Sequence, residues 1–332
     1  MATYALFVHG RGRGHASRAR GLLVHLRGRG HRVIVYAGGD ALDLLDRDPE
    51  LVRVDPVLPG PSALWTAPRR VSGDRRALAE LRPDAVVSDG DAPSIRAARA
   101  LGLPTVAIGH DQVFRRCDLR PGSSLARAHE RAIAGLTSGG AERAVAVHFL
   151  PITTHDPKTM VSRPDPPRGL RGPIRAGGGI VTYLRDGESA GFLAALAGRG
   201  RRVVAFGPMN DPPPGVELRA FDGEAFHAAL LGADAVIGTA GSNLLAECVL
   251  LGKPILALHG RRDHEQRLNA LLAARAGVAV AAALGDDPRA AVDALLARSD
   301  AGDFARVDLA AALPPASLAL ERALALTSGS SP

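Results

Sequence analysis

A glycine-rich turn that carries one histidine stands near the start of the chain. The apolar run Tyr4 to Val8 leads into Gly10 to Gly14, and His15 opens the helical pattern that follows. Such a turn places backbone N–H groups and the positive end of a helix dipole at the carboxyl edge of a sheet. An imidazole there can stay neutral near pH 7 and accept a proton from a hydroxyl. His15 is therefore our candidate general base, and a histidine that only caps the helix is the alternative.

Polar residues after the neighbouring strand-like runs could complete this site. Asp89 could orient His15, or Asp89 and Asp91 could cap the next helix, because aspartate is a preferred N-cap residue. Arg18 lies one helical turn after His15 and could hold a phosphate or an acidic acceptor. We predict Asp89 as a second catalytic residue, and we predict as acceptor-binding Arg18, Asp91, His110 and Asp111.

The strongest signal lies in the second half of the chain, where the strand-like run from 235 to 238 ends in small residues. A helix that starts there exposes amides, which can hold a diphosphate without a cation. Glu247, one turn into that helix, could accept both ribose hydroxyls or be an ordinary helix glutamate. The next loop offers paired donors and acceptors for sugar hydroxyls after a capping Asp263. The predicted donor-binding residues are Gly14, Thr239, Gly241, Ser242, Asn243, Glu247, His264, Glu265, Gln266 and Asn269.

No cofactor or metal is expected beside a nucleotide-sugar co-substrate. The glycine turn resembles a dinucleotide fingerprint, but no acidic residue ends the second strand near Tyr36, which disfavours an NAD enzyme. Cys117 and Cys248 are far apart, so neither a disulfide nor a thiolate metal site is indicated. The Asp-Gly-Asp at positions 89–91 has the form of a metal motif, but we interpret it as helix capping.

Apolar, β-branched runs alternate with helical patterns along most of the 332 residues. This alternation predicts an α/β fold with parallel sheets. Six prolines between 151 and 173 indicate a linker. We predict an N-terminal Rossmann-like domain over 1–150, a linker over 151–173, a C-terminal Rossmann-like domain over 174–312, and a C-terminal helix with a frayed tail over 313–332. The Pro- and Gly-rich stretch from Pro56 to Asp74, with Trp65, is expected to be a loop.

Composition narrows the class of partner. The formal net charge of +7 fits an anionic partner such as a nucleotide sugar, or peripheral contact with a membrane surface. Aromatic residues make up only 4% and no nucleic-acid-binding signature is present, so nucleic acid is not expected. The sequence contains no apolar stretch long enough to span a bilayer and no signal peptide, so we expect a cytoplasmic protein that does not span the membrane.

Two blocks of the chain resemble the GT-B glycosyltransferases, in particular the MurG-like, family 28 C-terminal type and related bacterial nucleotide-sugar glycosyltransferases. Residues 10–18 match a GxGxGHxxR opening, and residues 239–269 match a Gly-Ser block with a later Glu, a Gly-Lys-Pro and a closing Glu-Gln-x-x-Asn-Ala. The resemblance implies two Rossmann-like domains with parallel sheets facing across a cleft. It also implies that the C-terminal domain holds the nucleotide sugar, with Phe221 near the base, and that the N-terminal domain holds the acceptor.

The activity that this resemblance implies is inverting, metal-independent transfer of a hexose-type sugar from a UDP or dTDP sugar to a hydroxyl acceptor. The acceptor would be a natural product, as in antibiotic biosynthesis, or a cell-envelope glycan. Arg11 and Arg13 depart from the usual opening, and no apolar patch speaks for a lipid acceptor. Two alternatives remain. A nucleotide-sugar 2-epimerase would need several carboxylates around the sugar ring, and a non-catalytic nucleotide-sugar-binding partner protein would tolerate loss of His15.

Overall fold

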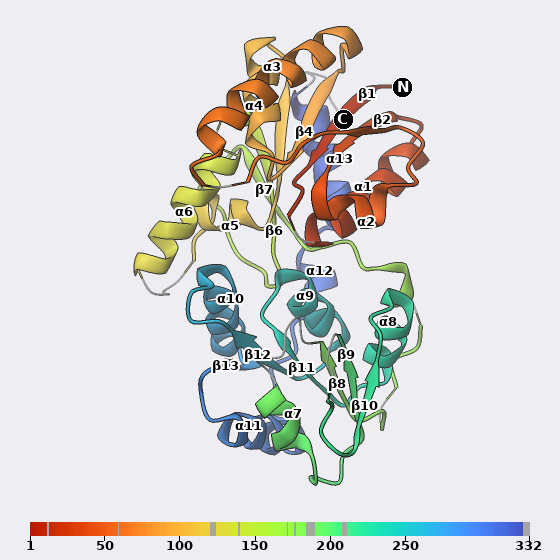
Figure 1. The fold of residues 1–332 in the computed structure, drawn as a ribbon, viewed down its shortest axis with the longest axis vertical. Helices are drawn as coiled ribbons and strands as arrows, with labels where there is room; N and C mark the ends of the chain where they lie inside the picture. Colours follow the sequence, from red (N-terminus) through yellow and green to blue (C-terminus); the bar gives the residue numbers. More distant parts are fainter. Residues whose placement is uncertain are drawn as a thin grey trace. The chain divides into compact units, whose positions relative to one another are not determined.

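The computed structural model describes residues 1–327 except 12, 59, 120–123, 139, 171, 176, 184–189 and 208–210. Gly12 of the glycine turn and the tail beyond residue 327, which was expected to fray, lie outside the described residues. The chain divides into two compact units (Figure 1). Unit 1 comprises Met1–Arg120, Ala128–Asp165 and Leu313–Pro332, and unit 2 comprises Pro121–Arg127 and Pro166–Ala312.

Unit 1 is built on a seven-stranded sheet in the order β3-β2-β1-β4-β5-β6-β7, and every pairing is parallel. The central strands β4 and β5 are buried along their whole length, because helices cover both faces of a parallel sheet, and such strands contain near-continuous apolar runs. The strands are β1 Thr3–Val8, β2 Arg32–Ala37, β3 Leu51–Arg53, β4 Ala85–Asp89, β5 Thr105–Gly109, β6 Arg143–Val147 and β7 Thr159–Ser162.

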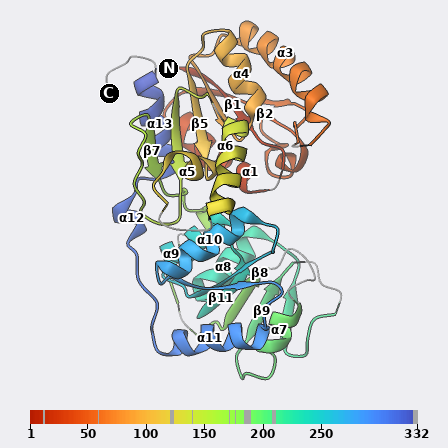
Figure 2. The same cartoon turned by 90° about the vertical axis from the view of Figure 1, so that its left-hand side faces the viewer.

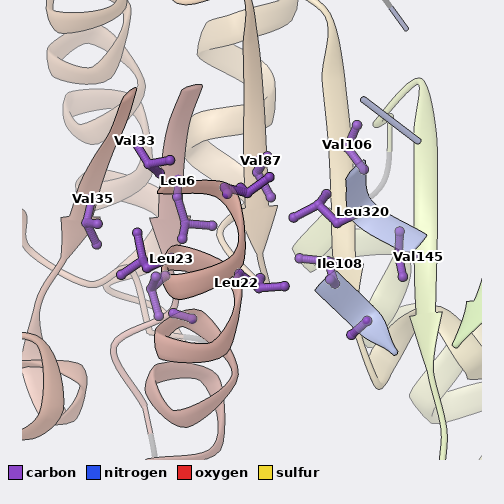
Figure 3. Packing of buried hydrophobic residues seen from close by; sticks show 14 of the residues in the cluster. Leu6, Leu22, Leu23, Val33, Val35, Val87, Val106, Ile108, Val145 and Leu320 are labelled. Atoms are coloured by element: carbon purple, nitrogen blue, oxygen red, sulfur yellow. The ribbon is translucent and has the colours of Figure 1, made fainter. Parts of the chain in front are cut away.

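One face of this sheet is covered by the first helix of the chain and by the last. Leu22 and Leu23 of α1 and Leu320 of α13 pack with strand residues such as Leu6 and Ile108 in one buried cluster (Figure 3). The C-terminal helix lies beside β7, as Figure 2 shows. The helices that precede β6 are α1 Arg13–Gly28, α2 Leu42–Leu45, α3 Ala63–Leu81, α4 Ala92–Ala100, α5 Asp111–Arg116 and α6 Ser124–Ser138, with the 3₁₀ turn η1 Gly39–Ala41. The C-terminal helix α13 is Ala316–Thr327.

Unit 2 repeats the plan with six parallel strands in the order β10-β9-β8-β11-β12-β13. The buried Lys253 precedes β12 and links the segments before β8 and β11, because its Nζ donates to the carbonyls of Arg175 and Ala233 at 2.9 and 2.6 Å. The strands are β8 Ile180–Tyr183, β9 Val203–Phe206, β10 Val216–Arg219, β11 Ala235–Thr239, β12 Ile255–His259 and β13 Ala279–Ala283. The helices are α7 Ala190–Leu196, α8 Gly223–Gly232, α9 Ser242–Leu251, α10 His264–Arg275, α11 Pro288–Asp300 and α12 Leu309–Ala312, with the 3₁₀ turn η2 Arg168–Leu170.

Both sheets have the strand order of a doubly wound fold. In such sheets the order reverses at one point, and ligands bind outside the carboxyl ends of the strands there. The reversal lies between β1 and β4 in unit 1 and between β8 and β11 in unit 2. The predicted α/β architecture with two Rossmann-like parallel sheets is confirmed. Ligand-binding residues are therefore expected at these two reversal points.

Two local expectations differ from the structure. Residues 151–173, which we expected to be a linker, contain β7, which pairs with β6, because the prolines stand on either side of the strand and not inside it. The stretch from Pro56 to Asp74, which we expected to be a loop, contains the start of α3, and this helix continues through Pro68. Proline is disfavoured inside helices, and this preference concealed the helix in the sequence pattern. In the described part of the chain, no helix is long and apolar enough to cross a membrane.

Candidate functional site

His15, Asp89 and Arg18 converge at the strand-order reversal of unit 1. The parallel pairing of β1 with β4 sets Val8 beside Asp89, and His15 stands in the first turn of α1, just after β1. His15 Nδ1 lies 2.7 Å from Asp89 Oδ1. Arg18 donates from Nε to Oδ2 and from Nη2 to Oδ1, both at 2.7 Å. The guanidinium therefore grips the carboxylate with two bonds, and the imidazole shares one of its oxygens.

The charge of Asp89 decides how His15 is protonated. Asp89 is fully buried, and burial alone would raise its pKa, but the charges of Arg18 and His15 outweigh burial and lower the pKa to about 2. An ionised carboxylate can only accept hydrogen bonds, so the Nδ1 of His15 must carry the proton that faces it. In the neutral imidazole with its proton on Nδ1, the lone pair lies on Nε2. The His15 side chain is 28% exposed, so this nitrogen belongs to a ring that solvent or a substrate can reach.

Glycines make room for this group. Gly90 has φ +75°, and a Cβ placed on it would lie 3.1 Å from His15 Cε1. A Cβ on Gly109 would lie 2.4 Å from Asp111 Oδ1 and 3.6 Å from Asp89 Oδ1. The glycines thus allow the two carboxylates and the imidazole to approach the backbone closely.

The other acceptor-side predictions have structural partners. Asp91, not Asp89, caps α4 by accepting from Ser94 N at 3.1 Å, and Arg70 Nη2 lies 3.2 Å from its other oxygen. Asp91 is 3% exposed, so its carboxylate is used inside the fold and does not serve acceptor binding.

The two residues after β5 also have partners within the fold. His110 is 5% exposed and stacks on His148 at 5.3 Å, so it packs in the interior and does not face an acceptor. Asp111 accepts from Gln112 Nε2 at 2.9 Å and from Thr137 Oγ1 at 3.2 Å. Asp111 is only half-buried.

The reversal point of unit 2 presents the bare start of a helix. Gly241 is the N-cap of α9 and supplies no side-chain cap, and the first turn carries no acidic residue. Ser242 and Asn243 are half-buried there. Helix-start amides that lack an internal partner, together with the positive end of the dipole, form an anion site. A Cβ on Gly241 would meet no heavy atom within 4 Å, so the space over this turn is open.

Glu247 follows on the same helix and faces a histidine. Its Oε1 lies 3.6 Å from His227 Nε2 of α8, and the two side chains are 13% and 17% exposed. The ring of Phe226, the residue before His227, contacts Phe221 and Tyr183 at centroid distances of 6.0 and 5.8 Å. The Glu247 carboxylate offers acceptors for sugar hydroxyls, and the aromatic cluster, which includes Tyr183 at the end of β8, offers faces for a base.

The residues of the second loop do different work from one another. Asp263 caps α10 by accepting from Gln266 N at 2.9 Å, which confirms its predicted capping role. Asn269 is fully buried and donates to the Ala240 carbonyl at 3.1 Å, so it braces the turn before α9 and does not contact a ligand directly. Glu265 is exposed and Gln266 is half-buried, as expected for groups that could meet a sugar.

A family model identifies the family to which the chain belongs. The model described as "Glycosyl transferase family 1" matches residues 62–299, well over half of the chain. The chain belongs to glycosyl transferase family 1. No curated protein sequence matches this glycosyltransferase significantly.

Solved structures show the same GT-B fold over the whole length of the glycosyltransferase. MurG from Acinetobacter baumannii is similar with a TM-score of 0.66 and 17% identity, covering 99% of this chain and all of the other. The glycosyltransferase VinC in complex with dTDP is similar with a TM-score of 0.67 and 18% identity, with the same coverage. A putative UDP-N-acetylglucosamine 2-epimerase from Listeria monocytogenes reaches 0.64 at 16% identity, covering 98% of this chain and 96% of the other. At these identities the likeness establishes the fold.

Two histidines of the glycosyltransferase escaped the sequence analysis. His9 directly follows β1 with its ring 5.4 Å from that of His15, and burial and the charge of His15 lower the pKa of His9. His227 faces Glu247 from another helix. The position of His9 directly before the glycine turn was a signal that could have been read. His227 had no local signal, because its partner is twenty residues away on a different element.

Proposed function

We propose that this glycosyltransferase moves a hexose-type sugar from a UDP or dTDP sugar to a hydroxyl acceptor in one inverting displacement, with His15 as the general base. The observation that carries the proposal is the 2.7 Å contact between His15 Nδ1 and the buried Asp89 carboxylate. This contact supports the tautomer with the proton on Nδ1, in which Nε2 can accept a proton, as in other histidine bases that are oriented by a carboxylate.

In the proposed step, the acceptor O–H proton passes to His15 Nε2 while the acceptor oxygen bonds to the anomeric carbon. The bond from that carbon to the diphosphate oxygen breaks, and its electron pair leaves with the diphosphate. Attack from the side opposite the leaving group inverts the anomeric centre. Asp89 stabilises the imidazolium that forms, and Arg18 keeps Asp89 ionised throughout.

We assign stabilisation of the leaving diphosphate to the start of α9. The uncapped helix start at Gly241, together with Ser242 and Asn243, supplies donors and a positive dipole where a metal-dependent enzyme would use a cation. Glu247 would accept from the ribose, and Glu265 and Gln266 would meet the sugar. Asn269 acts through the Ala240 carbonyl, which it holds in place.

A donor panel tests the proposal. Purified protein is incubated with UDP, dTDP and GDP sugars in EDTA, and both thermal stabilisation and slow donor hydrolysis are followed for wild type and for His15→Ala. The panel includes dTDP because VinC, a structural neighbour, was solved with it. His31→Ala is a matched control, since His31 precedes β2 at the opposite edge of the same sheet. We expect one nucleotide class to stabilise all three proteins.

We further expect hydrolysis that resists EDTA and is lost only in His15→Ala. Hydrolysis that persists unchanged in His15→Ala would remove His15 as the base. Loss of hydrolysis in EDTA that is restored by a divalent cation would remove the metal-independent mechanism. Absence of binding by every nucleotide would refute the donor assignment. The acceptor, which we place among natural products or cell-envelope glycans, is then sought with the donor that binds.

A further inference from the structure

A cavity lies in unit 1, away from His15 and Asp89. Its volume is about 450 Å³, and its lining includes Arg99, Thr105, Arg116, Glu142 and Lys158. Thr105 is the first residue of β5, Glu142 directly precedes β6, and Lys158 directly precedes β7. The cavity therefore opens at the amino ends of these strands, whereas His15 and Asp89 stand at the carboxyl ends. We call it the basic pocket.

The cations of the basic pocket are in different states. Arg116, at 8% exposure, pairs with Asp156 and donates to the Ala141 carbonyl at 3.4 Å, yet its Nε is buried without a hydrogen-bond partner. For the side chains of Arg99 and Lys158, by contrast, no hydrogen bond or ion pair with another described residue is found. Among the lining residues, only Glu142 offers a negative charge against them.

Arg99 and Lys158 are both exposed, and the guanidinium of Arg99 lies close to the backbone at Gly140. A Cβ placed on Gly140 would lie 2.6 Å from Arg99 Nη1, and Gly140 has φ +107°. The glycine thus lets the backbone pass directly beneath the guanidinium. Arg99 therefore lines the basic pocket together with Glu142 and Lys158.

We propose that the basic pocket binds a small phosphorylated, hydroxyl-bearing ligand that is not a substrate of the proposed reaction. Phosphate pairs with Arg99 and Lys158, which are suited to it by charge and by the several N–H donors of the guanidinium. Glu142 accepts from a hydroxyl of the same ligand. The volume lies within the usual range of small-molecule sites. Arg116 completes the positive wall and stays paired with Asp156.

Calorimetric titration of the full-length chain at low ionic strength tests the proposal. The probes are inorganic phosphate and glucose 6-phosphate, and every protein carries Ser242→Glu, so that a carboxylate occupies the anion site at the start of α9. We expect both probes to bind. Arg99→Ala and Lys158→Ala should each weaken binding about tenfold, which is the loss typical for one charge-assisted hydrogen bond. Arg96→Ala, an exposed arginine of the same helix that does not line the pocket, should leave affinity unchanged.

A further variant tests the role of Glu142. Glu142→Gln should strengthen the binding of inorganic phosphate, because a repulsive charge is removed. It should also reduce the preference for glucose 6-phosphate over inorganic phosphate. Equal affinities for Arg99→Ala, Lys158→Ala and Arg96→Ala, or no binding at all, would overturn the site. An unchanged preference in Glu142→Gln would overturn the hydroxyl contact. None of these readouts uses a nucleotide sugar or turnover, so they stand apart from the outcome for the proposed function.

Discussion

Replacing Asp89 by asparagine should separate its role in catalysis from its role in folding. Asn keeps the size of the side chain but removes the charge that places the proton on His15 Nδ1. An amide can donate to Nδ1, which would put the proton on Nε2 and block the base. We expect donor hydrolysis to fall by a factor on the order of 10³ to 10⁴, as for loss of the orienting aspartate in other histidine-base enzymes.

The same change has a cost in stability that the structure lets us size. Asp89 is fully buried and its pKa is lowered to about 2 from 3.8. This shift corresponds to about 2 to 3 kcal/mol of folding stability at neutral pH. The Asn variant also leaves Arg18, with a side chain 7% exposed, without its anion. Breaking a buried pair on one side costs about 3 to 5 kcal/mol in all.

The pH dependence supplies the check. Because the folded pKa is lowered, the stabilisation is complete above the unfolded pKa near 4 and is lost as pH falls through 4 toward 2. The Tm of wild type should therefore fall faster than that of Asp89→Asn between pH 5 and pH 3, when both are followed by circular dichroism. Asp84→Asn, at the exposed start of the same strand, is the control. Parallel Tm curves, or hydrolysis that survives in Asp89→Asn, would refute the assigned role.

Three further substitutions test Gly90 beside His15, His227 beside Glu247, and the buried Lys253. Gly90→Ala should lower stability by about 1 to 3 kcal/mol and reduce hydrolysis, because φ is +75° and the new Cβ meets His15; chemical denaturation and the hydrolysis assay check this, and a variant with unchanged activity would contradict it. His227→Gln should raise the donor KM about tenfold with kcat nearly unchanged, since it loosens Glu247 and not the reacting atoms; a fall in kcat alone would assign His227 to another step. Lys253→Met should lower the free energy of unfolding by about 3 kcal/mol through two unsatisfied carbonyls, while donor KM stays unchanged.

The sheets could be predicted from sequence because their signal is local. Most strands of both units can be recognised in the sequence as short apolar runs, and the glycine turns directly follow β1 and β11. β7 and α3 were lost because Pro argues against both strand and helix, although β7 has its prolines outside the strand and α3 accommodates Pro68. Short-range preference thus failed where tertiary pairing overrode it.

The site was predicted in its parts but not in its pairings. His15 and Asp89 are 74 residues apart, and only the adjacency of β1 and β4 brings them together. The sequence left open whether Asp89 or Asp91 caps α4, since both have the right chemistry, and the answer depends on which one the register turns toward His15. Asn269 was recognised as polar and well placed, but its burial and its bond to the Ala240 carbonyl are properties of the packed loop.

The 2-epimerase alternative requires a different set of carboxylates in unit 2 from the one that transfer requires. Epimerisation at C2 calls for several carboxylates around the sugar ring, whereas we assign Glu247 to the ribose and Asp263 caps α10. Glu247 also faces His227, while Glu265 is exposed. A UDP-N-acetylhexosamine incubated in D₂O without acceptor should therefore give free sugar with inverted anomeric configuration and no deuterium at C2, as followed by NMR. Deuterium at C2 in recovered donor would show that the carboxylates act on the ring, and it would favour epimerisation over transfer.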